Sequence, residues 1–180
     1  MSTLTPWGFS IPIYESTSSD DARFVLGTAG ENPLVCFGLN PSTANRTHSD
    51  LTVRIVSNLA KPPFDSFLMF NLSPERSTDP NGMGASINPL WKAWNERVVA
   101  DLIAGRHLRA YAAWGAHIRK RTYLTNGLLD ILRLPELRNL SWVSRRTTSA
   151  GHPHHPRGVA RVEPFAQFYV KNYSKQLPLP

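Results

Sequence analysis

Short, mostly apolar segments recur along the chain, separated by polar loops and by segments with helical periodicity. The apolar segments have the length of β-strands and cover residues 33–39, 66–72, 108–114 and 140–144. Apolar residues at nearly every position are typical of strands that are covered on both faces, as in a parallel sheet. The pattern therefore predicts four buried, parallel strands.

The segments between these strands carry helix signals. Helices are expected at residues 50–60, 88–105, about 116–132 and about 164–173. Either Ser49 or Asp50 can cap the first helix. In the second helix Asn88 can act as the cap, Pro89 suits the first turn and Gly105 can end the helix. Its buried face is predicted from apolar residues at helical spacing, namely Leu90, Trp94, Val98 and Leu102.

Alternating strands and helices predict the fold class α/β. Strand–helix–strand units need crossover connections, which produce a parallel sheet with helices on both faces. We therefore expect a three-layer arrangement with a four-stranded parallel sheet. A single domain is expected to cover residues 1–180, with its core at about 20–173, a hairpin around 23–32 and a loose tail at 174–180.

The composition indicates a folded protein with a basic surface. Hydrophobic residues make up 41% and charged residues 18% of the 180 positions, which suits one globular domain. The net charge of +7 points to a nucleic-acid partner, although a merely basic surface would also explain it. We expect DNA more than RNA, but the charge does not distinguish between them. The single cysteine, the absence of a long apolar stretch and an amino terminus without a signal pattern predict a cytoplasmic protein with no membrane partner.

Unusual polar residues gather in the four loops that follow the predicted strands. These loops read GLNPSTA from residue 38, NLSPERSTDP from 71, WGAHIRKR from 114 and RRTTSAGHPHHPRG from 145. In parallel sheets ligands bind beyond the carboxyl ends of the strands. The four loops are therefore predicted to form one site, although Gly, Pro and Asn are common in loops of any kind.

The order of these motifs resembles a bacterial family of unknown function. The shared elements are GLNPSTA, DLTVR, NLSPER, WGAH and GHPHHP, which extend over about residues 33–160. More remotely, the motifs resemble the uracil-DNA glycosylase superfamily, which has a four-stranded parallel sheet with helices on both faces. GLNP at 38–41 is most similar to its asparagine-bearing branch, which includes mismatch-directed enzymes. The resemblance implies base excision from nucleic acid, on a pyrimidine or a modified base.

The resemblance also implies a role for individual residues. Cleavage of an N-glycosidic bond builds positive charge on the sugar and negative charge on the base, so a site must place a water and stabilise an anion. Asn40 would orient the water and Asn71 would bind the edge of the base. His152 would donate a hydrogen bond to the leaving base, with His155 of the second His-Pro pair as the alternative. Base stacking would fall to Phe37, Phe70 or Trp114. Phosphate contacts would fall to Ser42, Arg76, Arg119, Lys120, Arg121, Arg145, Arg146 and Arg157.

Other interpretations of these residues stay open. An Asn before Pro at a strand end can simply start a turn, Asn71 can cap its own backbone, Trp114 can be a core residue, and the basic run at 119–121 can be a solvated helix face. The histidine cluster lacks the ordered spacing of a zinc site, so no metal and no cofactor is expected, even though His48 and Asp50 could complete a site in space.

Two other functions also fit the sequence. One is a non-catalytic nucleic-acid-binding module of the same fold, and the other is a hydrolase that acts on free nucleosides or nucleotides. Asn40 cannot accept a proton as an aspartate could, which predicts a slow enzyme or one that needs an activated leaving group.

Overall fold

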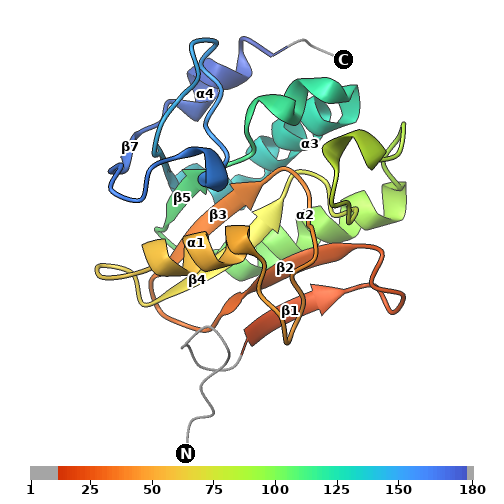
Figure 1. Ribbon diagram of the computed structural model, residues 1–180, viewed down its shortest axis with the longest axis horizontal. Coiled ribbons are helices and arrows are strands. Elements are labelled where there is room, and N and C mark those ends of the chain that lie inside the picture. The colour runs from red at the N-terminus through yellow and green to blue at the C-terminus, as the bar shows by residue number, and fades with distance from the viewer. Residues whose placement is uncertain (1–11, 178–180) are drawn as a thin grey trace, which may run out of the picture.

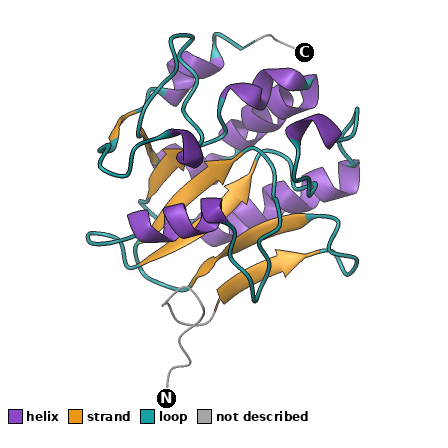
Figure 2. Ribbon diagram, viewed as in Figure 1, coloured by secondary structure: helices purple, strands orange, loops and turns teal. Residues whose placement is uncertain are grey.

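A computed structural model describes residues 12–177 as one mixed sheet between helices (Figure 1; Figure 2). The strands are β1 (Pro12–Ser16), β2 (Arg23–Thr28), β3 (Pro33–Gly38), β4 (Ser66–Asn71), β5 (Arg109–Ala112), β6 (Ser141–Ser144) and β7 (Ala166–Gln167). The α-helices are α1 (Leu51–Leu59), α2 (Pro89–Ile103), α3 (Thr122–Arg133) and α4 (Val170–Ser174). Short 3₁₀ turns occur at Pro80–Gly82, Ala116–Lys120, Pro135–Asn139 and Pro156–Gly158.

The four strands expected from the sequence are parallel and adjacent, in the order β4-β3-β5-β6. Three further strands extend the sheet with antiparallel pairing: β2 joins β4, β1 joins β2, and β7 joins β6. The expectation of a wholly parallel sheet of four strands is therefore wrong, because the described sheet has seven strands of mixed direction. The added strands β1 and β7 lie at the two edges, and their residues do not form the continuous apolar runs that marked the four parallel strands.

The hairpin at the amino-terminal side lies earlier than expected. It consists of β1 and β2, joined by a turn in which Asp20 has a φ of 59°. The expected hairpin around residues 23–32 does not form, because β4 lies between β2 and β3 in the sheet. All six residues of β2 are buried, as in β3 and β4.

The helix caps follow the sequence closely. The carboxylate of Asp50 accepts a hydrogen bond from the backbone N–H of Val53 at 2.8 Å and so caps α1. Asn88 caps α2 in the same way, with Pro89 in its first turn. Gly105 follows α2 with a φ of 69°, in the left-handed region that favours glycine.

Two expected helices are shorter than predicted. The segment expected from 116 to 132 begins with the 3₁₀ turn Ala116–Lys120, and α3 starts only at Thr122. The segment expected from 164 to 173 contains β7 and the short α4. Within the expected tail, Leu177 packs in the core, and residues 178–180 lie outside the described part of the chain.

The buried face of α2 also differs from the prediction. Leu90 is 78% and Trp94 is 53% exposed. The residues of α2 that are buried are Asn95, Val98, Val99 and Ile103. The helix is therefore rotated so that Asn95 faces the sheet and donates from Nδ2 to the backbone carbonyl of Asn71 at 3.0 Å.

The sheet is covered on both faces, which gives three layers (Figure 2). Alternate residues of β3 point to opposite sides: Val35 and Phe37 pack with residues of α2 and α3, whereas Leu34 and Cys36 pack with residues of α1. This two-sided burial explains why the parallel strands are apolar at nearly every position. Between residues 12 and 177, no helix is long and apolar enough to cross a membrane.

Candidate active site at the carboxyl ends of the parallel strands

A pocket of about 440 Å³ lies where β3, β4, β5 and β6 end. All four loops predicted from the sequence contribute to its wall, together with the start of α1. The lining residues that the sequence had indicated are Asn40, Ser42, Asn71, Trp114, His155 and Arg157. His154, the other histidine of the 145–158 loop that the sequence had left open, also lines the pocket. Polar residues that the structure adds include Arg23, Thr52, Thr78, His117 and Thr148. A pocket of this size can enclose a ligand as large as a nucleoside or nucleotide.

Asn71 is the most unusual polar residue of the pocket. It ends β4 and is 0% exposed, yet neither Oδ1 nor Nδ2 has a hydrogen-bond partner among residues 12–177. Gly38 on the neighbouring strand makes room for this side chain, because a β-carbon there would lie 2.7 Å from Asn71 Oδ1. Buried amide groups are almost always hydrogen-bonded in proteins. The side chain of Asn71 therefore offers both a donor and an acceptor to a ligand.

Asn40 is held in a defined orientation at the start of the loop that follows β3. Its Nδ2 donates to the backbone carbonyls of Pro41 at 3.0 Å and of Ser77 at 2.8 Å. Because both partners are acceptors, the amide nitrogen must face them, and this fixes the position of the side-chain oxygen. That oxygen makes no hydrogen bond within the described chain, so it can accept one from a water molecule in the pocket.

His155 can donate a hydrogen bond as a neutral ring. Its Nδ1 accepts from the backbone N–H of Arg157 at 3.3 Å, which leaves the proton of the neutral imidazole on Nε2. Burial, followed by the positive charge of Arg157, lowers the pKa of His155 to about 4. The ring is therefore neutral at pH 7.

His152 does not line the pocket and is 6% exposed. Trp114 donates from Nε1 to the hydroxyl of Tyr173 at 3.3 Å, and that hydroxyl lies 2.8 Å from His152 Nδ1. The Tyr173 hydroxyl can therefore donate its own proton to His152. These contacts connect the 145–158 loop to α4. Of the two histidines that the resemblance suggested, the structure brings only His155 to the pocket.

The aromatic candidates are placed differently from one another. Phe37 and Phe70 are both 0% exposed and pack against each other with ring centroids 5.6 Å apart. They belong to the core and do not border the pocket. Trp114 does border it, but its ring also packs against Trp142 and Phe168. Among these three, only Trp114 can contact a pocket ligand.

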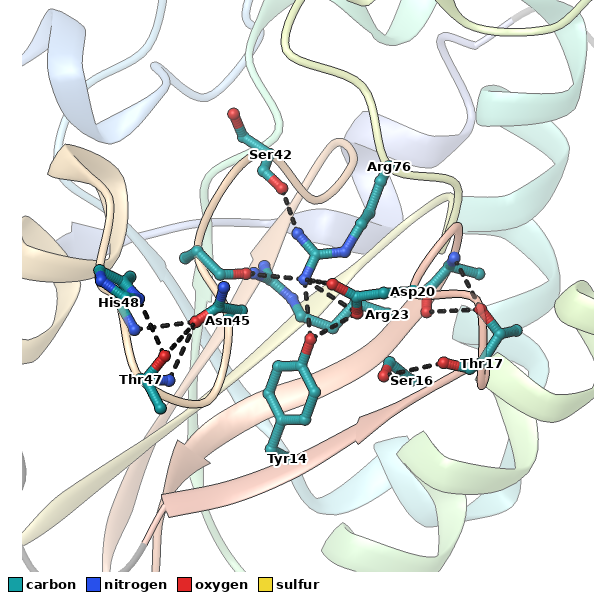
Figure 3. Close-up of polar contacts among 12 residues, drawn as sticks. Tyr14, Ser16, Thr17, Asp20, Arg23, Ser42, Asn45, Thr47, His48 and Arg76 are labelled. Carbon is teal, nitrogen blue, oxygen red and sulfur yellow. Dashed lines mark hydrogen bonds and ion pairs between the residues drawn. The ribbon is translucent and has the colours of Figure 1, made fainter.

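Arg76 serves as an internal clamp, as Figure 3 shows. Its guanidinium donates to the backbone carbonyls of Ser42 and of Ala44, the latter at 2.9 Å. It also donates to the hydroxyl of Tyr14 at 2.7 Å and forms an ion pair with Asp20 at 3.1 Å. These bonds join the loop after β3 to the β1–β2 hairpin and leave little of the guanidinium for a phosphate.

The remaining basic candidates fall into two groups. Arg145 is buried, and its guanidinium donates to backbone carbonyls of Glu163 and Arg161, both at 2.9 Å, so it supports a loop. Arg121 is partly buried and donates to backbone carbonyls of the 81–83 segment. The exposed candidates are Arg119, Lys120, Arg146 and Arg157, of which Lys120 contacts the side chain of Asn81. Arg157 is the only one of these four that lines the pocket.

Sequence reasoning missed Arg23. It is the first residue of β2 and 1% exposed, and it lines the pocket. The available signal was a single arginine at the start of an otherwise apolar run, RFVLGT. In the part of the chain that the structure describes, no group of three or more His, Cys, Asp or Glu side chains could hold a metal ion.

The fold and the pocket define a mixed α/β protein with a polar site at the carboxyl ends of its parallel strands. A family described as "Protein of unknown function (DUF1643)" matches residues 23–157, and the chain belongs to this family. Membership of a family of unknown function, as expected from the motifs, is thereby confirmed. No curated protein and no solved structure matches the chain. The matched segment runs from Arg23 to Arg157 and contains every pocket residue except Gly158.

Proposed function

We propose that this protein hydrolyses the N-glycosidic bond between a base and its sugar in nucleic acid, preferably DNA. The observation that carries the proposal is the pair Asn40 and Asn71, which line one pocket. Among residues 12–177, both amide atoms of Asn71 and the amide oxygen of Asn40, whose Nδ2 is held by two backbone carbonyls, have no protein partner. The amide of Asn71 offers a donor and an acceptor, which is the complement of a pyrimidine edge. The base would be held out of the nucleic-acid stack in the pocket.

Each polar group then has a chemical task. The bond between the sugar carbon and the base nitrogen breaks, and its electron pair leaves with the base. Water oriented by the Asn40 oxygen adds to the sugar carbon and loses its proton to solvent, since an amide cannot take it. The Nε2–H of neutral His155 stabilises the negative charge on the leaving base. In this proposal His155 takes the role that the resemblance had first suggested for His152.

The charge distribution supports a nucleic-acid substrate. Arg119 and Lys120 are exposed in the 3₁₀ turn that begins at the pocket residue Ala116, and Arg146 is exposed in the loop that leads from β6 to His155. Basic side chains on loops beside a pocket are suited to bind the phosphates that flank an extruded base. The resemblance to the uracil-DNA glycosylase superfamily adds support through the motifs on the four loops, although it does not cover the antiparallel strands.

The test is release of a free base. Purified protein is incubated with single- and double-stranded DNA that carries uracil, mismatched thymine or modified pyrimidines, and abasic sites are revealed by alkaline cleavage. We expect cleavage with at least one substrate, and its loss in Asn40→Ala. Asn58→Ala, which removes an exposed asparagine side chain from α1, is the matched control and should retain activity.

The outcome that contradicts hydrolysis is equally defined. Binding to these DNAs that weakens with salt, without base release at any protein concentration, would instead indicate the non-catalytic binding module. Equal base release by wild type and Asn40→Ala would remove the assigned role of Asn40.

A further inference from the structure

Arg23 has the placement of a ligand-binding residue, not of a structural one. Its Nη1 donates to the backbone carbonyl of Ala44 at 2.8 Å, whereas its Nε is buried without a partner. Its Nη2 makes no hydrogen bond within residues 12–177. The side chain nevertheless lines the pocket. A guanidinium has five N–H donors. Within the described chain, only one of the three guanidinium nitrogens of Arg23 has a protein partner.

Arg23 also has no carboxylate partner in the described part of the chain. The nearby Asp20 forms its ion pair with Arg76. Burial, and then the positive charge of Arg76, lowers the pKa of Arg23 to about 10, so the group is still charged at pH 7. The carboxylates of Asp50 and Asp20 are near enough to raise the pKa of Arg23 in part, but neither forms an ion pair with it in the described chain. A buried charge without a direct ion pair is costly, and an anion bound in the pocket would offset that cost.

The rest of the pocket suits an anion with several oxygens. Arg157 adds a second positive charge, and Ser42, Thr52 and Thr78 add hydroxyl groups to the lining. Asp50 is the opposing carboxylate in the lining, and one of its oxygens already accepts the backbone N–H of Val53. Two arginines and one carboxylate give this part of the lining a net positive charge, which favours an anionic ligand.

We propose that Arg23 binds a phosphate group of a nucleotide inside this pocket, together with Arg157 and the hydroxyls of the lining. Three phosphate oxygens can use the donors that line this pocket, and a carboxylate, with two oxygens, would use fewer. The inference that this phosphate belongs to a nucleotide rests on the proposed function. The phosphate site itself does not need the protein to catalyse any reaction.

The first test uses inorganic phosphate and isothermal titration calorimetry, with ionic strength held constant by chloride. Wild type should bind phosphate, and Arg23→Met should bind it about tenfold or more weakly, since a charge-assisted hydrogen bond to the anion is lost. Arg23→Lys keeps the charge and should bind with an intermediate affinity. Arg138→Ala removes an exposed positive charge that does not line the pocket and has no role in the proposed function, and it should change the affinity less than about twofold.

In this test the proposal is overturned if wild type binds no phosphate, or if Arg138→Ala weakens binding as much as Arg23→Met. A second measurement covers the case in which Arg23→Met does not fold. In wild-type protein the ¹⁵N–¹H resonance of Arg23 Nε, assigned through its own side-chain carbons, should shift during a phosphate titration. A resonance that stays unchanged at saturating phosphate also contradicts the site.

A comparison of ligands identifies the source of the phosphate. A pyrimidine nucleoside, its 5′-monophosphate and a dinucleoside phosphodiester are titrated in turn. A gain with the monophosphate indicates a free nucleotide, a gain with the phosphodiester indicates a polymer, and a gain with neither overturns the proposal. Base release without phosphate binding would refute this site and leave the proposed function intact. Phosphate binding without base release would support this site and contradict the proposed function.

Discussion

The replacement Asn71→Leu should stabilise the free protein while removing base recognition. Leucine has the same number of side-chain heavy atoms as asparagine, with the same branching, so it can replace Asn71 at the edge of the pocket with little change in volume. In the wild type, both amide atoms of Asn71 are buried without a partner in the segment that the structure describes. An unsatisfied buried polar group costs about 1–3 kcal/mol. After allowance for imperfect packing of the leucine, we expect a gain of about 1 kcal/mol, which raises the Tm by roughly 2–4 °C in a domain of this size.

The assay is urea unfolding of wild type and variant, followed by circular dichroism, with base release measured on the same samples. The matched control is Asn95→Leu at another buried asparagine. Asn95 donates from Nδ2 to the carbonyl of Asn71 at 3.0 Å, and in the described part of the chain only its Oδ1 is buried without a partner. Asn95→Leu therefore loses a hydrogen bond that Asn71→Leu does not lose, and it should be less stable than wild type by about 1 kcal/mol. The reasoning is refuted if Asn71→Leu is destabilised by as much as the control, because Asn71 would then be a structural residue.

Three further predictions concern the frame of the pocket. Arg76→Met should lower the free energy of unfolding by about 2 kcal/mol in urea titrations, since charged hydrogen bonds to two loops are lost; an unchanged midpoint would contradict the clamp. Gly115→Ala should cost about 1–3 kcal/mol, because a φ of 73° with a ψ of −178° is almost restricted to glycine, and thermal unfolding checks this value. The pKa of His155 is about 4 in the folded state against an ordinary value of 6.5, so the unfolded state binds the proton first as the pH falls. Stability should therefore decrease from about pH 6.5 to about pH 4, and His155→Gln should lose this part of the decrease; an identical pH profile in the variant would count against a neutral, buried ring.

The parallel strands and the caps could be predicted because each has a local signal. Burial on both faces makes a strand such as β3 apolar throughout, and a cap such as Asp50 stands directly before its helix. The orientation of α2 could not be predicted in this way. Trp94 lies at the border of the helix interface and stacks on Phe24 with ring centroids 5.4 Å apart, whereas the polar Asn95 faces the sheet to satisfy a backbone carbonyl.

The location of the candidate site could be predicted from the sequence more reliably than the residues that line it. The loops could be assigned to one edge of the sheet because parallel strands end together. The partner of each polar side chain depends on distant segments. Arg76 meets carbonyls from the loop after β3, and His152 meets Tyr173 from α4. Arg23 comes from a strand that the sequence pattern had not placed beside the site.

The most direct measurement is the single-turnover rate of base release by wild type, Asn40→Ala and Asn58→Ala on the best DNA substrate. We predict release by wild type and by Asn58→Ala at similar rates. Asn40→Ala should be slower by about 10²-fold, since the attacking water loses its orientation. Equal rates for all three proteins, or no release by folded wild type from any substrate, would contradict hydrolysis by this pocket.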